Sequence, residues 1–230
     1  MEEIPVVFMA YDLLEHQGED IRELPMAERR ALLEVIVKEV NNENLLVSPL
    51  VEFKAWADLD SLIETAREKR CEGFMLKLKD SAYEVGRKKG NWWKWKVDPY
   101  SIDAVLTFAM RGHGRRANLY TDYTFGLWQD GELITFAKAY SGLSDKEFNQ
   151  VDSFVRKNTV QRFGPVRQVK PELVFELAFE GIALSTRHKS GVAVRFPRMI
   201  RWRTDKKSNE ANSLSDLIDL IPEDGRNQDG

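Results

Sequence analysis

The 230-residue sequence contains a single cysteine and no long apolar run. Cys71 therefore has no partner for an internal disulfide, and we expect a buried thiol in a reducing compartment. No segment approaches the ~20 consecutive apolar residues of a membrane span. The acidic opening MEEIPVV lacks the basic flank and apolar core of a signal peptide. These absences predict a cytoplasmic protein with no membrane partner.

The sequence also has few histidines and no net positive charge. The three histidines, His16, His113 and His188, are far apart and lack the spacing of metal ligands. A net charge of -3 argues against indiscriminate binding to DNA or anionic membranes. Any surface for nucleic acid must therefore be local. The segment 187–207 fits this description, because it holds eight basic residues and one acid: Arg187, Lys189, Arg195, Arg198, Arg201, Arg203, Lys206 and Lys207 with Asp205.

The order of predicted elements changes near Pro99. Before it, strands predicted at 4–14, 45–54, 72–79 and 91–98 are interleaved with helices at 25–40 and 58–70. After it, strands at 101–110, 123–140, 172–184 and 192–203 surround one helix at 144–158, and a short helix follows at 212–221. The sequence thus predicts an α+β protein with domains at 1–98 and 99–230. The second is predicted as a closed barrel of the oligonucleotide-binding (OB) type, with a sandwich as the alternative.

Two short motifs in the first domain carry candidate chemistry. EGFMLK places Glu72 at the start of a strand and Lys77 five residues later, on opposite faces unless the strand end bends. NWWKWK places Trp92, Lys94 and Lys96 on one face. Two adjacent lysines repel each other unless an anion lies between them, so the pair indicates a site for a transferring phosphoryl group. A solvated face over a tryptophan-rich sheet is the alternative, and we expect these tryptophans to be core residues.

The tract RFPRMIRWRTDK is the third motif. Arginine keeps its charge and matches phosphate oxygens with a planar fork, so the tract predicts phosphate contacts. Arg201, Arg203 and Asp205 fall on one side of the strand, and the acid would orient the guanidinium groups. The alternative is a charged strand at the barrel edge that discourages edge-to-edge pairing.

In this order, the three motifs resemble those of ATP-dependent DNA ligases, in the covalent nucleotidyltransferase superfamily. The segment from Tyr11-Asp12 through Asp20-Ile21-Arg22 to Pro25 and Arg29-Arg30 is similar to a further family segment. The resemblance covers residues 4 to about 207 and implies an adenylation domain followed by an OB barrel. It implies nucleotide-binding roles for Tyr11 (adenine stacking), Glu72 (through Mg²⁺ or Mn²⁺), Lys77, Lys94 and Lys96 (α-phosphate). It implies that Arg203, Asp205 and Lys206 orient the pyrophosphate of ATP.

The resemblance also implies substrates and limits. ATP and nicked duplex DNA would be the partners of a monomeric enzyme. Candidate DNA contacts are Arg111, Arg115, Arg116, Arg198 and Arg201. The family's nucleophile motif, Lys-x-Asp-Gly, does not occur in these 230 residues. We therefore expect the C-terminal part of a ligase, unable to form an enzyme–AMP intermediate by itself.

Two other functions are compatible with parts of this pattern. An RNA ligase or an RNA-capping guanylyltransferase would share the nucleotidyltransferase domain, although the Arg-x-Asp-Lys ending favours a DNA ligase. A noncatalytic DNA-binding OB module is the alternative outside enzymes, and it would have no need for Glu72, Lys94 and Lys96 together.

Overall fold

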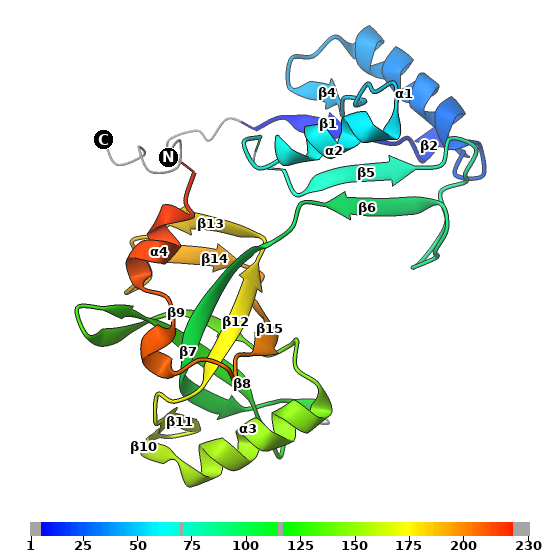
Figure 1. Ribbon diagram of the computed structural model, residues 1–230. Helices are drawn as coiled ribbons and strands as arrows, with labels where there is room; N and C mark the ends of the chain where they lie inside the picture. The colour runs from blue at the N-terminus through cyan, green and yellow to red at the C-terminus, as the bar shows by residue number, and fades with distance from the viewer. Residues whose placement is uncertain (1–5, 70, 115–116, 223–230) are drawn as a thin grey trace. The chain divides into compact units, whose positions relative to one another are not determined.

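The computed structural model describes residues 6–69, 71–114 and 117–222 and separates the chain into two units, Met1–Val97 and Asp98–Gly230 (Figure 1). The separation falls one residue before the predicted boundary after Asp98. The candidate nucleotide motifs thus belong to the first unit, and the Arg-x-Asp-Lys tract belongs to the second.

The first unit is built from short strands and two helices. A parallel pair of strands, β1 and β4, is joined through helix α1, which supplies the crossover that parallel strands need. Two antiparallel hairpins, β2–β3 and β5–β6, complete the unit. In chain order its elements are β1 Phe8–Ala10, β2 Glu15–His16, β3 Glu19–Asp20, α1 Met26–Val40, β4 Leu45–Val47, α2 Trp56–Glu64, β5 Gly73–Lys77 and β6 Trp92–Lys96.

Local sequence explains where these elements begin and end. Helix α1 follows Pro25, whose fixed φ suits a helix start, and ends at Asn41 in the left-handed conformation. Strand β4 ends at Val47, well short of the prediction of 45–54, because Pro49 has no N–H to donate to a neighbouring strand. Helix α2 ends at Glu64, earlier than the predicted 70.

Two predictions about burial in this unit are wrong. Cys71 is exposed, since it follows the turn after α2 and lies outside the paired strands. Trp93 is 52% exposed, although it lies on the face of the β5–β6 hairpin opposite to Lys94, where Trp95 is half-buried. Trp92 and Trp95 are half-buried.

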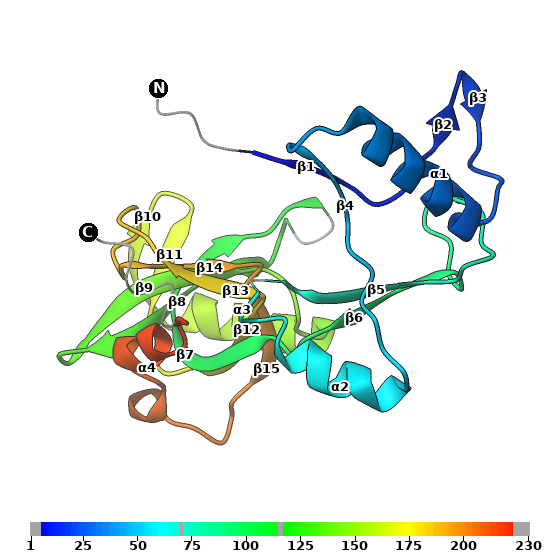
Figure 2. The ribbon, with the colours of Figure 1, turned by 90° about the horizontal axis from the view of Figure 1, so that it is seen from above.

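The second unit is a curled, seven-stranded sheet with additional hairpin and helical elements (Figures 1 and 2). Strand β7 is central: it pairs with β8 on one side and with β12 and β11 on the other. Strand β9 continues the sheet beyond β8, and β15 continues it beyond β12. The elements are β7 Tyr100–Arg111, β8 Tyr120–Gln129, β9 Glu132–Ala139, α3 Asp145–Lys157, β10 Thr159–Phe163, β11 Val166–Val169, β12 Val174–Phe179, β13 Gly181–Leu184, β14 Val192–Arg195, β15 Arg198–Trp202, η2 Ser208–Glu210 and α4 Leu214–Asp219.

The sheet curls until β15 meets the segment that follows β9. The Met199 amide donates to the Ser141 carbonyl at 3.0 Å. Gly142 makes this approach possible, because its φ is +111° and a Cβ there would lie 1.7 Å from the Met199 carbonyl oxygen. The interior is filled by aromatic residues, with Phe125 and Phe175 fully buried. This is the small barrel that the strand pattern predicts.

Helix α3 and the hairpin signals also match the prediction. Ser144 caps α3 through the Glu147 amide, and the Glu147 carboxylate accepts from the Ser144 amide at 2.8 Å. Asp130 and Gly131 have positive φ, as a two-residue hairpin turn between β8 and β9 requires. The β10–β11 hairpin was not predicted. Its signal was two short β-prone runs around Gly164.

Candidate functional site

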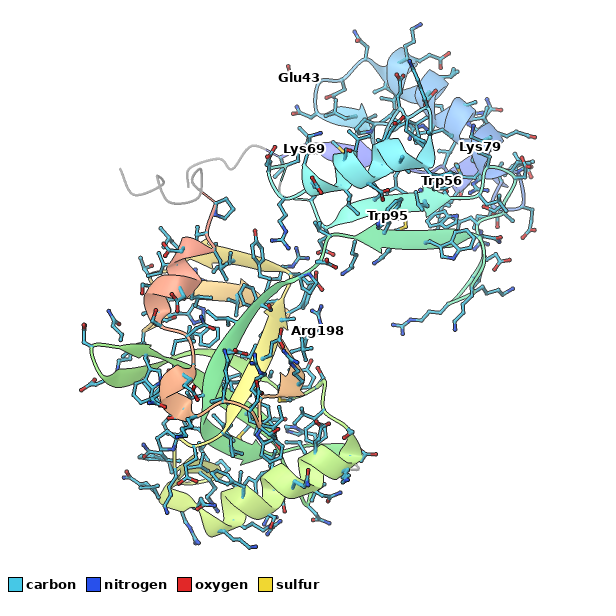
Figure 3. All side chains as sticks on the ribbon, in the orientation of Figure 1. Glu43, Trp56, Lys69, Lys79, Trp95 and Arg198 are labelled. Carbon is cyan, nitrogen blue, oxygen red and sulfur yellow. The ribbon has the colours of Figure 1, made fainter. Side chains whose placement is uncertain are left out.

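The β5–β6 hairpin gathers three lysines on one face. Its register pairs Lys77 with Trp92, Met75 with Lys94 and Gly73 with Lys96, and cross-strand partners point to the same side. Lys77, Lys94, Lys96 and Trp92 therefore share a face, as the alternation in NWWKWK predicts. Trp95, labelled in Figure 3, belongs to the opposite face, where its ring meets Phe74 at a centroid distance of 6.4 Å.

Lys77 lies between two aromatic rings. Its Nζ is 4.6 Å from the centroid of Tyr11 and 4.1 Å from the centroid of Trp92, which are cation–π distances. The same Nζ lies 3.5 Å from the Tyr11 carbonyl oxygen. Burial lowers the pKa of Lys77 from its ordinary value, and the nearby carboxylate of Asp12 opposes this shift. The Tyr11 ring remains 52% exposed, so its outer surface is open to a ligand.

Glu72 reaches the lysine face because the chain bends at Gly73. Gly73 has φ +131°, and a Cβ there would lie 2.1 Å from the Trp95 carbonyl oxygen, so only glycine fits. The Glu72 Oε2 then lies 3.2 Å from Lys96 Nζ. A regular strand would have placed Glu72 and Lys77 on opposite faces. The bend at Gly73 brings Glu72 to the face that carries the lysines.

A buried ion pair holds the chain next to Tyr11. The Arg29 guanidinium donates to both carboxylate oxygens of Asp12 at 2.8 and 2.9 Å. It also donates to the main-chain carbonyls of Leu24 and Ser81. The side chains of Arg29 and Asp12 are 0% and 3% exposed. The family-like segment of the sequence contains both residues, but the pairing across 17 positions was not predicted.

One carboxylate of this face fits a divalent cation. Within the described residues, no three His, Cys, Asp or Glu side chains gather to hold a metal ion by themselves. Mg²⁺ at phosphate sites is commonly held by one or two carboxylates together with phosphate oxygens and water. Glu72 suits that donor set, because its carboxylate is 38% exposed and lies beside the lysines.

The Arg-x-Asp-Lys residues form an ion network within the barrel. Arg203 Nη1 lies 2.8 Å from Asp103 Oδ2, and Lys206 Nζ reaches the same oxygen at 2.5 Å. Arg203 also pairs with Asp205 at 2.7 Å. The hydrogen bonds from Arg203 lower the pKa of Asp205 to about 2, and Asp205 in turn raises the pKa of Arg203. Asp103 was not predicted from the sequence, although an acid within the apolar run of β7 was the available signal.

The predicted DNA-binding arginines fall into separate groups. Arg198, labelled in Figure 3, pairs with Glu180 at 2.9 Å, and Arg201 pairs with Glu176 at 2.7 Å. Arg111 is exposed at the end of β7, and its guanidinium lies 5.8 Å from the centroid of Tyr120. Arg115 and Arg116 lie outside the described residues.

Family models match both units of the chain. The model described as "ATP dependent DNA ligase domain" matches residues 1–96, and the one described as "ATP dependent DNA ligase C terminal region" matches residues 116–206. The chain belongs to the ATP-dependent DNA ligase family. None of the helices described in this ligase-family chain is long and apolar enough to cross a membrane.

Individual relatives agree with this assignment. A probable DNA ligase from Koribacter versatilis (strain Ellin345) is 37% identical over 92% of this chain and 40% of its own length. A DNA ligase from Methanoculleus marisnigri is 30% identical over 100% of this chain and 40% of its own length. The chain thus spans about two fifths of these curated relatives.

Solved structures support the fold of the ligase-family chain. A chain named Pmar-Lig_PreS3 aligns with a TM-score of 0.62 and 18% identity, over 79% of this chain and 40% of that one. A chain from a structure-function analysis of Lig E DNA ligases gives a TM-score of 0.61 with 19% identity, over 86% of this chain and 63% of that one. The prediction of a partial adenylation domain followed by an OB barrel is therefore confirmed at the level of fold.

Proposed function

We propose that this chain binds the nucleotide phosphates and the DNA in an ATP-dependent DNA ligase. Such an enzyme seals nicks in duplex DNA through enzyme–AMP and DNA–adenylate intermediates. The observation that carries the proposal is the shared face of the β5–β6 hairpin, where Glu72, Lys94 and Lys96 lie together beside Lys77 and Tyr11. A noncatalytic binding module would have no need for this combination.

This face carries the charged groups that phosphoryl transfer requires. Alignment of the reacting groups and neutralisation of phosphate charge account for most of the catalysis in such reactions. Lys94 and Lys96 would contact the α-phosphate, and Lys77 adds a third positive charge fixed between two rings. The exposed face of Tyr11 would stack on the adenine. Mg²⁺ or Mn²⁺, when held by Glu72, would neutralise further phosphate charge.

The barrel network would act on the pyrophosphate. Asp205 fixes the plane of the Arg203 guanidinium, and Asp103 holds Arg203 and Lys206 at one point. A pyrophosphate would take over the hydrogen bonds that Arg203 and Lys206 now give to Asp103, while Asp205 keeps its hold on Arg203. We therefore assign Arg203 and Lys206 to pyrophosphate binding and Asp205 to positioning Arg203.

This chain alone should not form a covalent intermediate with AMP. The covalent step needs an activated lysine, and the 230 residues contain no Lys-x-Asp-Gly. The intact mass of the chain after incubation with ATP and Mg²⁺ tests this point. We expect no AMP adduct, and a stoichiometric adduct on any lysine would overturn this part of the proposal.

Nick sealing by a chimera tests the proposed function as a whole. The chain replaces the region of the Koribacter ligase with which it aligns, so that the relative supplies the remaining parts. We expect sealing of a nicked DNA duplex in the unmodified chimera. Lys96→Met and Glu72→Gln should each lower the rate by roughly 10²-fold or more, as loss of one preorganised charge-stabilising group typically does. Lys89→Met, in the loop before β6, is the matched control and should leave the rate unchanged.

The same chimera separates the alternatives. Sealing at the unmodified rate in both the Lys96→Met and Glu72→Gln variants would contradict a phosphate role for this face and favour a binding module. Preference for a nick with RNA strands over the DNA nick would favour an RNA ligase.

A further inference from the structure

Three arginines surround one tyrosine in the second unit. Helix α3 and strands β10 and β11 lie together at one end of the barrel (Figure 1). The guanidinium carbons of Arg111, Arg156 and Arg167 lie 5.8, 5.5 and 5.8 Å from the centroid of Tyr120. They come from three different elements, β7, α3 and β11. The Tyr120 ring therefore fixes three cations that the sequence does not place together.

The centre of this cluster is rigid. Tyr120 is 5% exposed, and its amide donates to Asp152 Oδ1 at 2.8 Å. The Tyr123 hydroxyl donates to the Tyr120 carbonyl at 2.7 Å. Arg156 is oriented by Asp152 at 2.7 Å and by the Asn118 carbonyl at 2.8 Å. A guanidinium that is already fixed loses less entropy when it binds an oxyanion.

The unpredicted β10–β11 hairpin adds a fourth cation. Arg162 lies directly opposite Arg167 in the antiparallel register, and its side chain is on an exposed strand. Like charges directly opposite each other destabilise a strand pair. An anion bound between the two side chains would remove that repulsion.

Charge balance distinguishes this cluster from the other arginines of the barrel. Asp152 pairs with Arg156, but no described carboxylate lies within ion-pair distance of Arg111, Arg162 or Arg167. On the β12–β15 side, Arg198 and Arg201 each meet a glutamate. The cluster around Tyr120 thus has an excess of about three positive charges, whereas the charges of Arg198 and Arg201 on β15 are balanced by two glutamates.

We propose that Arg111, Arg156, Arg162 and Arg167 form a phosphate-binding patch that contacts the backbone of duplex DNA. The inference rests on the proposed function, because ligation requires the barrel to hold DNA. Guanidinium groups bind phosphate oxygens through their planar fork and provide affinity that does not depend on base sequence. The patch, rather than the glutamate-paired Arg198 and Arg201, is the main backbone contact among the described arginines of the barrel.

Fluorescence anisotropy of the full chain with a labelled nicked duplex tests the patch at several salt concentrations. Arg111→Gln combined with Arg162→Gln is the test variant, because no hydrogen bond to the rest of the fold involves either side chain among the described residues. We expect a loss of affinity of about tenfold and a decrease of roughly two in the slope of log K against log salt. Arg198→Gln with Arg201→Gln removes the same number of charges and should change affinity less than threefold. Replacement of Arg111 and Arg162 by lysine should retain most of the salt slope.

Three results would overturn the proposal. One is unchanged DNA affinity in the Arg111→Gln/Arg162→Gln variant with folded circular dichroism spectra, and another is no binding of duplex DNA by the unmodified chain. The third is micromolar binding of inorganic tripolyphosphate that the variant loses while DNA binding persists, since this would identify a free polyphosphate site. If only the patch proposal is wrong, the Koribacter chimera still seals nicks and Lys96→Met still slows sealing. If the proposed function is wrong, Lys96→Met leaves the sealing rate of that chimera unchanged.

Discussion

The ion pair between Asp12 and Arg29 is the contact of the first unit whose loss should cost the most stability. Both side chains are buried, and Arg29 hydrogen-bonds both carboxylate oxygens as well as main-chain carbonyls from two other segments. Arg29→Met keeps most of the side-chain volume but removes the charge and every donor. The substitution leaves the Asp12 carboxylate buried without its partner.

The magnitude follows from that burial. Removing one partner of a buried ion pair costs about 3–5 kcal/mol, because the remaining charge is uncompensated. Exposed helical pairs at i,i+4 contribute only about 0.3–0.5 kcal/mol. The neighbouring i,i+4 pair Arg30–Glu34 is closer to the second kind, with an N–O distance of 2.6 Å and side chains that are 15% and 51% exposed. Arg30→Met is therefore a control with the same chemical change one residue away.

Urea unfolding of the full chain, followed by tryptophan fluorescence, measures the difference. Four of the six tryptophans lie in the first unit, so the signal reports mainly on its unfolding. We expect a far lower urea midpoint for Arg29→Met than for Arg30→Met, and the double variant Asp12→Asn/Arg29→Met should recover part of the loss. Equal midpoints for Arg29→Met and Arg30→Met would refute the reasoning.

Three further predictions concern single positions. Gly73→Ala should abolish hydrogen-exchange protection in β5–β6 because its Cβ meets the Trp95 carbonyl, whereas Gly86→Ala, also at positive φ but with nothing within 4 Å, should cost only about 1–2 kcal/mol; equal effects would contradict the contact. Ser144→Ala should lower the free energy of unfolding by about 1 kcal/mol in urea titrations through loss of the α3 cap, and no change would show that the cap is dispensable. Arg203 lowers the pKa of Asp205 from 3.8 to about 2, so their contact stabilises the fold above pH 3.8 and is lost as the pH falls through about 2. NMR titration of the Asp205 carboxyl should show that pKa rising toward 3.8 in Arg203→Gln, and an unchanged value would exclude Arg203 as the cause.

Elements with a clear local pattern were predictable from the sequence. Helix α1 matches the predicted 25–40 within a residue, and the capping pair Ser144 and Glu147 marks the start of α3. The β10–β11 hairpin was missed because its strands are short and mostly exposed, which leaves weak hydrophobic alternation. The strand predicted at 45–54 is too long, because Pro49 lacks the N–H that a longer pairing would need.

The candidate site was predictable only where its residues are neighbours in one strand. Alternation alone places Lys94 and Lys96 on one face. The position of Glu72 depends on the backbone bend at Gly73, which a residue pattern does not reveal. Asp103 meets Arg203 across 100 positions, and such long-range pairs follow from tertiary packing rather than from local sequence.

The measurement that tests the central claim most directly is an amide and lysine-ammonium NMR titration of this chain with Mg²⁺-ATP. If the β5–β6 face binds the nucleotide phosphates, shift changes should concentrate at Tyr11, Glu72, Lys77, Lys94 and Lys96. The signal of Lys89 should stay in place. Shift changes that spare the β5–β6 face while ATP binds elsewhere on the chain would contradict the account.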